Sequence, residues 1–123
     1  MMFLLDKRNE PSSHETLVRK LNQSVDDKDL CIFRSIDALK DRLEEFLEEK
    51  SILIFRPTNS NELHKMQEIR NLPLDIEMIL ILPDDDLETL QNAHSLRPRY
   101  IAYDNSDYEN VVSVARKISR KSS

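Results

Sequence analysis

Five short apolar runs alternate with segments of helical periodicity along this chain. In the third run, Ile52 to Phe55, four apolar residues follow one another without alternation, and the run passes directly into Arg56 and Pro57. An unbroken run of this kind is typical of a strand that is buried on both faces of a sheet. The remaining runs predict four further strands, at residues 1–5, 30–33, 78–82 and 100–103.

Between the runs, apolar residues recur every three or four positions, which predicts helices. We expect these helices near residues 13–25, 36–47, 60–72, 87–96 and 107–118. Ser35 is of a type that favours the N-cap position. Three pairs of residues have the spacing of a capping box at predicted helix starts: Ser12 with Glu15, Asn59 with Glu62, and Ser106 with Glu109.

The order of these elements, five strand-then-helix units, predicts an α/β protein. It should be a (βα)5 three-layer sandwich, with a five-stranded parallel sheet and helices on both faces. For five strands we predict the flavodoxin-like order 2-1-3-4-5. The chain has 123 residues, a length that suits one domain, and no stretch is left over as a linker. We therefore expect a single domain over residues 1–123.

Composition narrows the function mainly by exclusion. The chain contains no glycine, whereas phosphate-cradling P-loops and dinucleotide-binding loops require it. The net charge is -5, which argues against nucleic acid as a partner because no basic stripe is available to contact phosphates. No apolar stretch is long enough to span a bilayer, and the first residues lack the features of a signal peptide. The single Cys31 lies in an apolar run, so we expect a buried thiol in a cytoplasmic protein.

A (βα)5 chain of this length, with an acid closing the first strand and a tyrosine-containing fifth strand before the last helix, resembles the receiver domain of bacterial response regulators. The resemblance covers nearly the whole chain and rests on element order more than on motifs. It implies two-component signalling by a cytoplasmic domain. In such receivers, acids after the first strand hold magnesium, and an aspartate at the end of the third strand accepts a phosphoryl group.

Matched position by position, the resemblance implies a degenerate site. One acid of the first pair is present and is followed by a cation, while an arginine stands at the phosphoacceptor position. Neither the hydroxyl residue that ends the fourth strand nor the lysine that ends the fifth is present. The matching positions in this chain are Asp6, Lys7, Arg56, Pro83 and Asp104.

A guanidinium remains protonated and cannot act as a nucleophile. We therefore expect no phosphotransfer at Arg56. Because parallel strands end at one edge of a sheet, Arg56 should lie beside Asp6, with Asp84 and Asp104 nearby. We predict that Arg56 takes the place of the metal and neutralises these acids through a charge-assisted pair with Asp6, for which the guanidinium offers bidentate geometry.

The first hypothesis for function is a phosphorylation-independent signalling module that binds a protein partner or a second copy of itself. Receivers commonly use the fourth helix, fifth strand and fifth helix for such contacts. Aromatic and arginine residues are also favoured at interface centres. The candidate residues on this surface are Leu90, His94, Tyr100, Tyr103, Tyr108, Val111 and Arg116.

The alternative is a domain that binds a small anion at the carboxyl edge of the first and third strands. Asp6, Arg56 and the Thr58-Asn59-Ser60 segment would line that site, although the capping preference of asparagine favours a helix cap as the role of Asn59. An enzyme is not expected. His14, His64 and His94 lie on three different predicted helices without metal-ligand spacing, and we interpret each as a surface or cap residue. No metal or other cofactor is predicted.

Overall fold

The apolar runs form five strands in a computed structural model of the chain: β1 (Met2–Asp6), β2 (Leu30–Phe33), β3 (Ser51–Arg56), β4 (Ile76–Leu82) and β5 (Tyr100–Tyr103). All four strand pairings are parallel, and the order is β2-β1-β3-β4-β5. The predicted fold class and strand order are thus confirmed. The structure describes residues 2–7, 11–24, 30–45, 51–73, 75–103 and 108–121.

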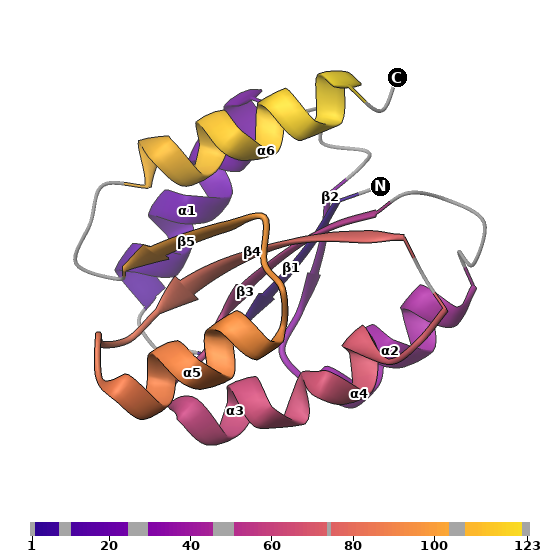
Figure 1. The fold of residues 1–123 in the computed structure, drawn as a ribbon. Coiled ribbons are helices and arrows are strands. Elements are labelled where there is room, and N and C mark those ends of the chain that lie inside the picture. Colours follow the sequence, from indigo (N-terminus) through magenta and orange to yellow (C-terminus); the bar gives the residue numbers. More distant parts are fainter. Residues whose placement is uncertain are drawn as a thin grey trace.

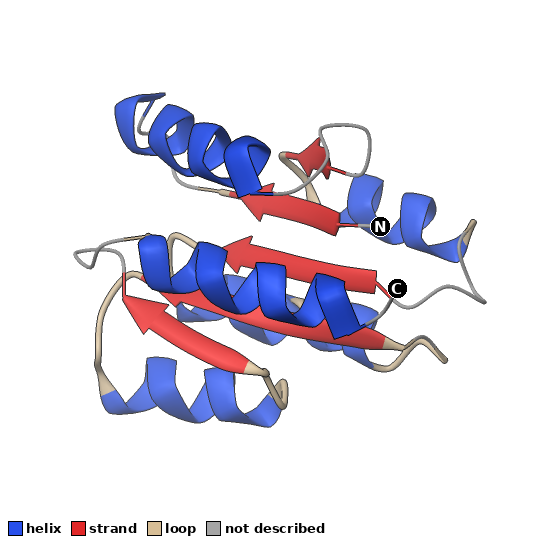
Figure 2. Cartoon of the chain, turned by 90° about the horizontal axis from the view of Figure 1, so that it is seen from above, coloured by secondary structure: helices blue, strands red, loops and turns tan. Residues whose placement is uncertain are grey.

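The helices lie in two layers, one on each face of the sheet (Figure 1). One layer contains α1 (Pro11–Ser24) and α6 (Glu109–Lys121), and the other contains α2 (Ile36–Glu44), α3 (Ser60–Lys65), α4 (Gln67–Arg70) and α5 (Leu87–Ser95). Seen from above, α1 lies near β1, whereas α6 crosses the middle of the sheet (Figure 2). This arrangement is the predicted three-layer sandwich, and it follows from parallel strands that need helical crossovers.

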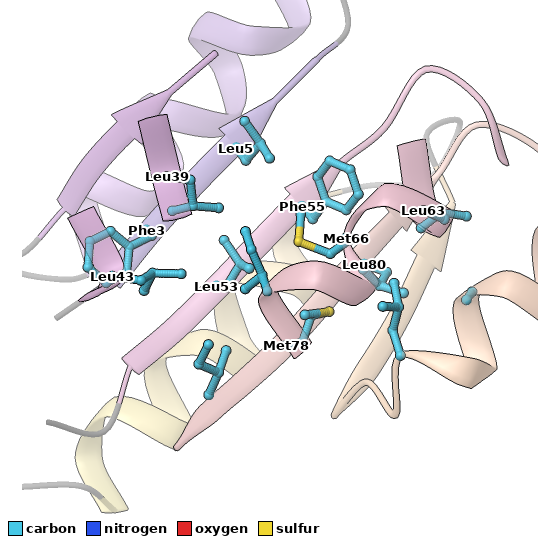
Figure 3. Close-up of a cluster of buried hydrophobic side chains, with 14 of the residues drawn as sticks. Phe3, Leu5, Leu39, Leu43, Leu53, Phe55, Leu63, Met66, Met78 and Leu80 are labelled. Carbon is cyan, nitrogen blue, oxygen red and sulfur yellow. The ribbon is translucent and has the colours of Figure 1, made fainter. Parts of the chain in front are cut away.

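Alternate residues of the central strands point into two separate cores, because successive side chains of a strand face opposite sides. Phe3, Leu5, Leu53 and Phe55 face α2 to α5 (Figure 3). Their neighbours Met2, Leu4, Ile52 and Ile54 face α1 and α6. Asp6 and Arg56 continue the second set, so their side chains turn toward α1 and α6.

Two predicted helix starts are confirmed by their caps. The Ser35 side chain accepts a hydrogen bond from the Ala38 N–H, and the Asn59 side chain accepts one from the Glu62 N–H. The capping residue Ser106 lies outside the described residues, as do Phe46 and Leu47 at the predicted end of the second helix.

The third predicted helix is divided in two at Met66. The Met66 N–H bonds to the carbonyls of both Glu62 and Leu63, which marks a local tightening of the backbone toward three residues per turn. Leu63, Met66 and Ile69 recur every three residues and are all fully buried. The tighter turn brings these three side chains closer into line, whereas in an ideal α-helix each would be turned by about 60° from the one before it.

Candidate functional site at the carboxyl edge of the sheet

Arg56 and Asp6 end adjacent parallel strands and are direct partners in the register of β1 with β3. Both are fully buried, with 0% of their surface exposed. The Arg56 Nη1 lies 3.1 Å from each carboxylate oxygen of Asp6. The predicted ion pair is therefore confirmed, although one nitrogen contacts both oxygens and these contacts do not form the parallel two-nitrogen fork.

The guanidinium also holds the first turn of α1. Its Nη2 donates to the Ser13 Oγ at 2.9 Å. Ser13 lies just inside α1, which begins after the loop that leaves β1. Arg56 makes a second contact with this helix layer through Tyr108, the residue before α6. The centroid of the Tyr108 ring lies 5.9 Å from the Arg56 Cζ. A cation at this distance is attracted to the face of an aromatic ring. Arg56 thus connects β1, α1 and the start of α6.

The imidazole of His14 also contacts Asp6, and sequence reasoning missed this contact. Its Nδ1 lies 2.8 Å from Asp6 Oδ2, and only 14% of its side chain is exposed. Because an ionised carboxylate only accepts hydrogen bonds, we assign the hydrogen to Nδ1. Its interpretation as a surface or cap residue is therefore wrong. The sequence did contain a signal for this contact. His14 lies in the first turn of the helix that follows the strand ending in Asp6, and the start of such a helix lies above the carboxyl edge of the sheet.

Lys7 does not join this group. Its Nζ donates to the Arg34 carbonyl at 3.2 Å and lies 3.8 Å from Glu62, on the side of α2 and α3. Pro83 is half-buried in the loop after β4. Asp84 was expected near Arg56, but it is exposed and accepts a hydrogen bond from the Asp86 N–H of its own loop. That expectation is wrong. Asp104 lies outside the described residues.

The predicted interaction surface is only partly a surface. Val111 is fully buried and Tyr108 is 7% exposed, because both pack into the core between the sheet and α6; their assignment to a surface is wrong. Arg116 lines a cleft between α1 and α6, away from α5. Of the others, His94 is exposed, and three residues are half-buried: Leu90, Tyr100 and Tyr103.

Most of the polar groups considered for an anion site are already bonded. Thr58 Oγ1 donates to the Lys7 carbonyl, Asn59 caps α3, and the Arg56 guanidinium is enclosed. These contacts leave the Arg56 guanidinium and the Asn59 side chain engaged within the protein. Chemically, the described contacts connect α1 and the residue before α6 to the ends of two strands.

Comparisons of the chain with protein-family models, with curated proteins and with solved structures give no match. In the described ranges, no set of three or more His, Cys, Asp or Glu side chains is arranged to hold a metal ion. The described helices also include none that is long and apolar enough to cross a membrane.

Proposed function

We propose that this chain is a receiver-like signalling module that acts by binding other proteins and has no phosphotransfer activity. The observation that carries this proposal is the buried Arg56–Asp6 pair at the ends of β3 and β1. In an open parallel sheet, the crevice beyond the strand ends is where a ligand would normally bind. Here the side chains that end β1 and β3 are fully buried and bonded to each other.

The chemistry of this pair supports a role without phosphorylation. An acyl phosphate requires a carboxylate nucleophile, and magnesium assists its formation. Arg56 supplies no nucleophile. The acid beside it, Asp6, is fully buried and accepts hydrogen bonds from both Arg56 and His14. Attack by Asp6 on a phosphoryl donor would require these contacts to break and the core to open.

Incubation with acetyl phosphate and magnesium, followed by intact-mass measurement, tests the proposal. We expect no phosphoryl adduct, whereas a receiver that retains its aspartate, treated in parallel, should be labelled. If the wild type is labelled, peptide mapping will identify the acceptor. A phosphoryl group on Asp6 that disappears in Asp6→Asn would contradict the proposal.

A further inference from the structure

A cleft of about 320 Å³ lies between α2 and the α3–α4 segment. Part of its described lining comes from segments that follow three strands: Lys7 after β1, Ser35 and Ile36 after β2, and Glu62 in the helix after β3. In an open α/β sheet, a ligand usually binds beyond the carboxyl ends of the strands, at the point where the strand order reverses. In the order β2-β1-β3-β4-β5, that point lies between β1 and β3. The cleft is therefore at the place in this fold that suits a small ligand.

An ion pair of partly buried side chains lines this cleft. The Lys7 Nζ lies 3.8 Å from the Glu62 Oε2, and the two side chains are 30% and 15% exposed. Each is also held by the backbone, because Lys7 donates to the Arg34 carbonyl and Glu62 accepts from the Thr58 N–H. An ammonium has three donors and a carboxylate about four acceptor sites, so each charge retains capacity for a ligand. The cleft thus presents one positioned cation beside one positioned anion.

Further charges of both signs surround this pair. Asp37 lines the cleft from the first turn of α2, while Lys65 and Glu68 line it from α3 and α4. Glu62, Lys65 and Glu68 recur every three residues, and the tighter turn at Met66 brings them closer into line along the cleft. Within the described part of the chain, no ion pair engages Asp37, Lys65 or Glu68.

This pattern of charge favours a ligand that carries both an ammonium and a carboxylate. A simple anion would be attracted by two lysines but repelled by three carboxylates, and a simple cation would be repelled by the lysines. An α-amino acid bears both charges on one carbon, so they lie close together, as those of Lys7 and Glu62 do. The volume is near the lower end of the range for ligand pockets, and Ile36 is the one apolar residue in the described lining. Both features suit a short side chain.

We infer that this cleft binds a free α-amino acid with a short side chain. The carboxylate of the ligand pairs with the Lys7 ammonium, and its ammonium pairs with the Glu62 carboxylate, so that four charges alternate in sign. Both contacts are charge-assisted hydrogen bonds. Because the backbone already holds Lys7 and Glu62, little side-chain entropy is lost on binding. This site is separate from the protein-binding role proposed above and does not depend on it.

Titration of isotopically labelled protein with glycine, L-alanine and L-serine, followed through its amide chemical shifts, tests the site. We expect at least one of the three to shift the amide signals of Lys7, Ser35 and Glu62 in a saturable manner. The N-acetyl derivative of that amino acid lacks the ammonium and its methyl ester lacks the carboxylate, so each should bind about 10-fold more weakly or worse. If none of the three amino acids gives saturable shifts, or if either derivative binds equally well, the inference is wrong.

Neutral variants test the role of the ion pair. Lys7→Met and Glu62→Gln each remove one charge and keep most of the side-chain shape, and each should weaken binding by about 10-fold or more. Lys20→Met/Glu109→Gln is the matched control, because the Lys20 Nζ lies 3.6 Å from the Glu109 Oε1 in the cleft between α1 and α6. This control should leave binding unchanged.

Two results with these variants would contradict the inference: wild-type affinity in both Lys7→Met and Glu62→Gln, or an equal loss of affinity in the control. Amide spectra of the unliganded variants show whether each one folds. If a cleft variant does not fold, the comparison of the amino acid with its two blocked derivatives on the wild-type protein decides the question.

Discussion

Replacement of Arg56 by methionine should be among the most destabilising changes in this chain. Methionine keeps much of the apolar stem, so the main loss is the guanidinium and its contacts with Asp6, Ser13 and Tyr108. Asp6 would remain fully buried with its principal cation removed. Breaking a buried ion pair in this way costs about 3–5 kcal/mol.

This cost corresponds to a large shift in melting temperature. With an unfolding entropy of about 2.1 cal/mol/K per residue, a chain of 123 residues loses roughly 4 °C per kcal/mol. Arg56→Met should therefore melt about 12–20 °C below the wild type. Calorimetry and urea unfolding measured by circular dichroism check this value. Arg19→Met, which removes an exposed cation from α1, is the control and should change stability by less than about 0.5 kcal/mol.

The double variant Asp6→Leu/Arg56→Met separates the two contributions. Replacing a whole buried ion pair with apolar residues is often neutral or stabilising. We expect the double variant to regain at least about 2 kcal/mol relative to Arg56→Met alone. Two results would refute the reasoning: a cost below about 1 kcal/mol for Arg56→Met, or a double variant as unstable as the sum of the single changes.

His14→Leu should lower the free energy of unfolding by about 1.5–3 kcal/mol, because it removes a hydrogen bond to a buried charged group. In the same urea-unfolding assay, His64→Leu, at an exposed position, should be nearly neutral. Equal losses for the two variants would contradict the assigned contact of His14 with Asp6. Asn59→Ala should lower the free energy of unfolding by about 1 kcal/mol through loss of the α3 N-cap. Asn59→Ser should retain most of that stability in the same assay. A neutral Asn59→Ala would show that the cap contributes nothing to stability.

The strands and their order were predictable because the central runs are buried on both faces, and such runs leave little choice of architecture. The pairing of Arg56 with Asp6 was predictable for the same reason, since adjacent parallel strands end together. The contacts that Ser13, His14 and Tyr108 make with this pair were not predicted. Each lies in or beside the first turn of a helix, and its contact with a strand end depends on how that helix packs, which the periodicity of one segment does not specify.

The errors on the interaction surface have a different origin. Val111, Ala115 and Ile118 recur at helical spacing, which already placed Val111 on the buried side of the last helix. The resemblance to receivers indicated which elements form the interaction surface in that family. It did not indicate which side of the last helix faces water. Asp84 was predicted in the wrong place because its side chain accepts a hydrogen bond from the Asp86 N–H of the same loop. The conformation of this loop depends on a local turn, which strand order does not determine.

The pairing of Arg56 with Asp6 also affects the register in which β1 and β3 align. The two residues are register partners, and a slip of one residue between β1 and β3 would turn one of them to the opposite face. Each charge would then be buried without the other, at a cost of several kcal/mol per ion. Apolar side chains alone distinguish such slips weakly, because either face of the sheet accepts leucine or isoleucine. We therefore expect the ion pair to make incorrect alignments of β1 with β3 unstable, in addition to stabilising the correct one.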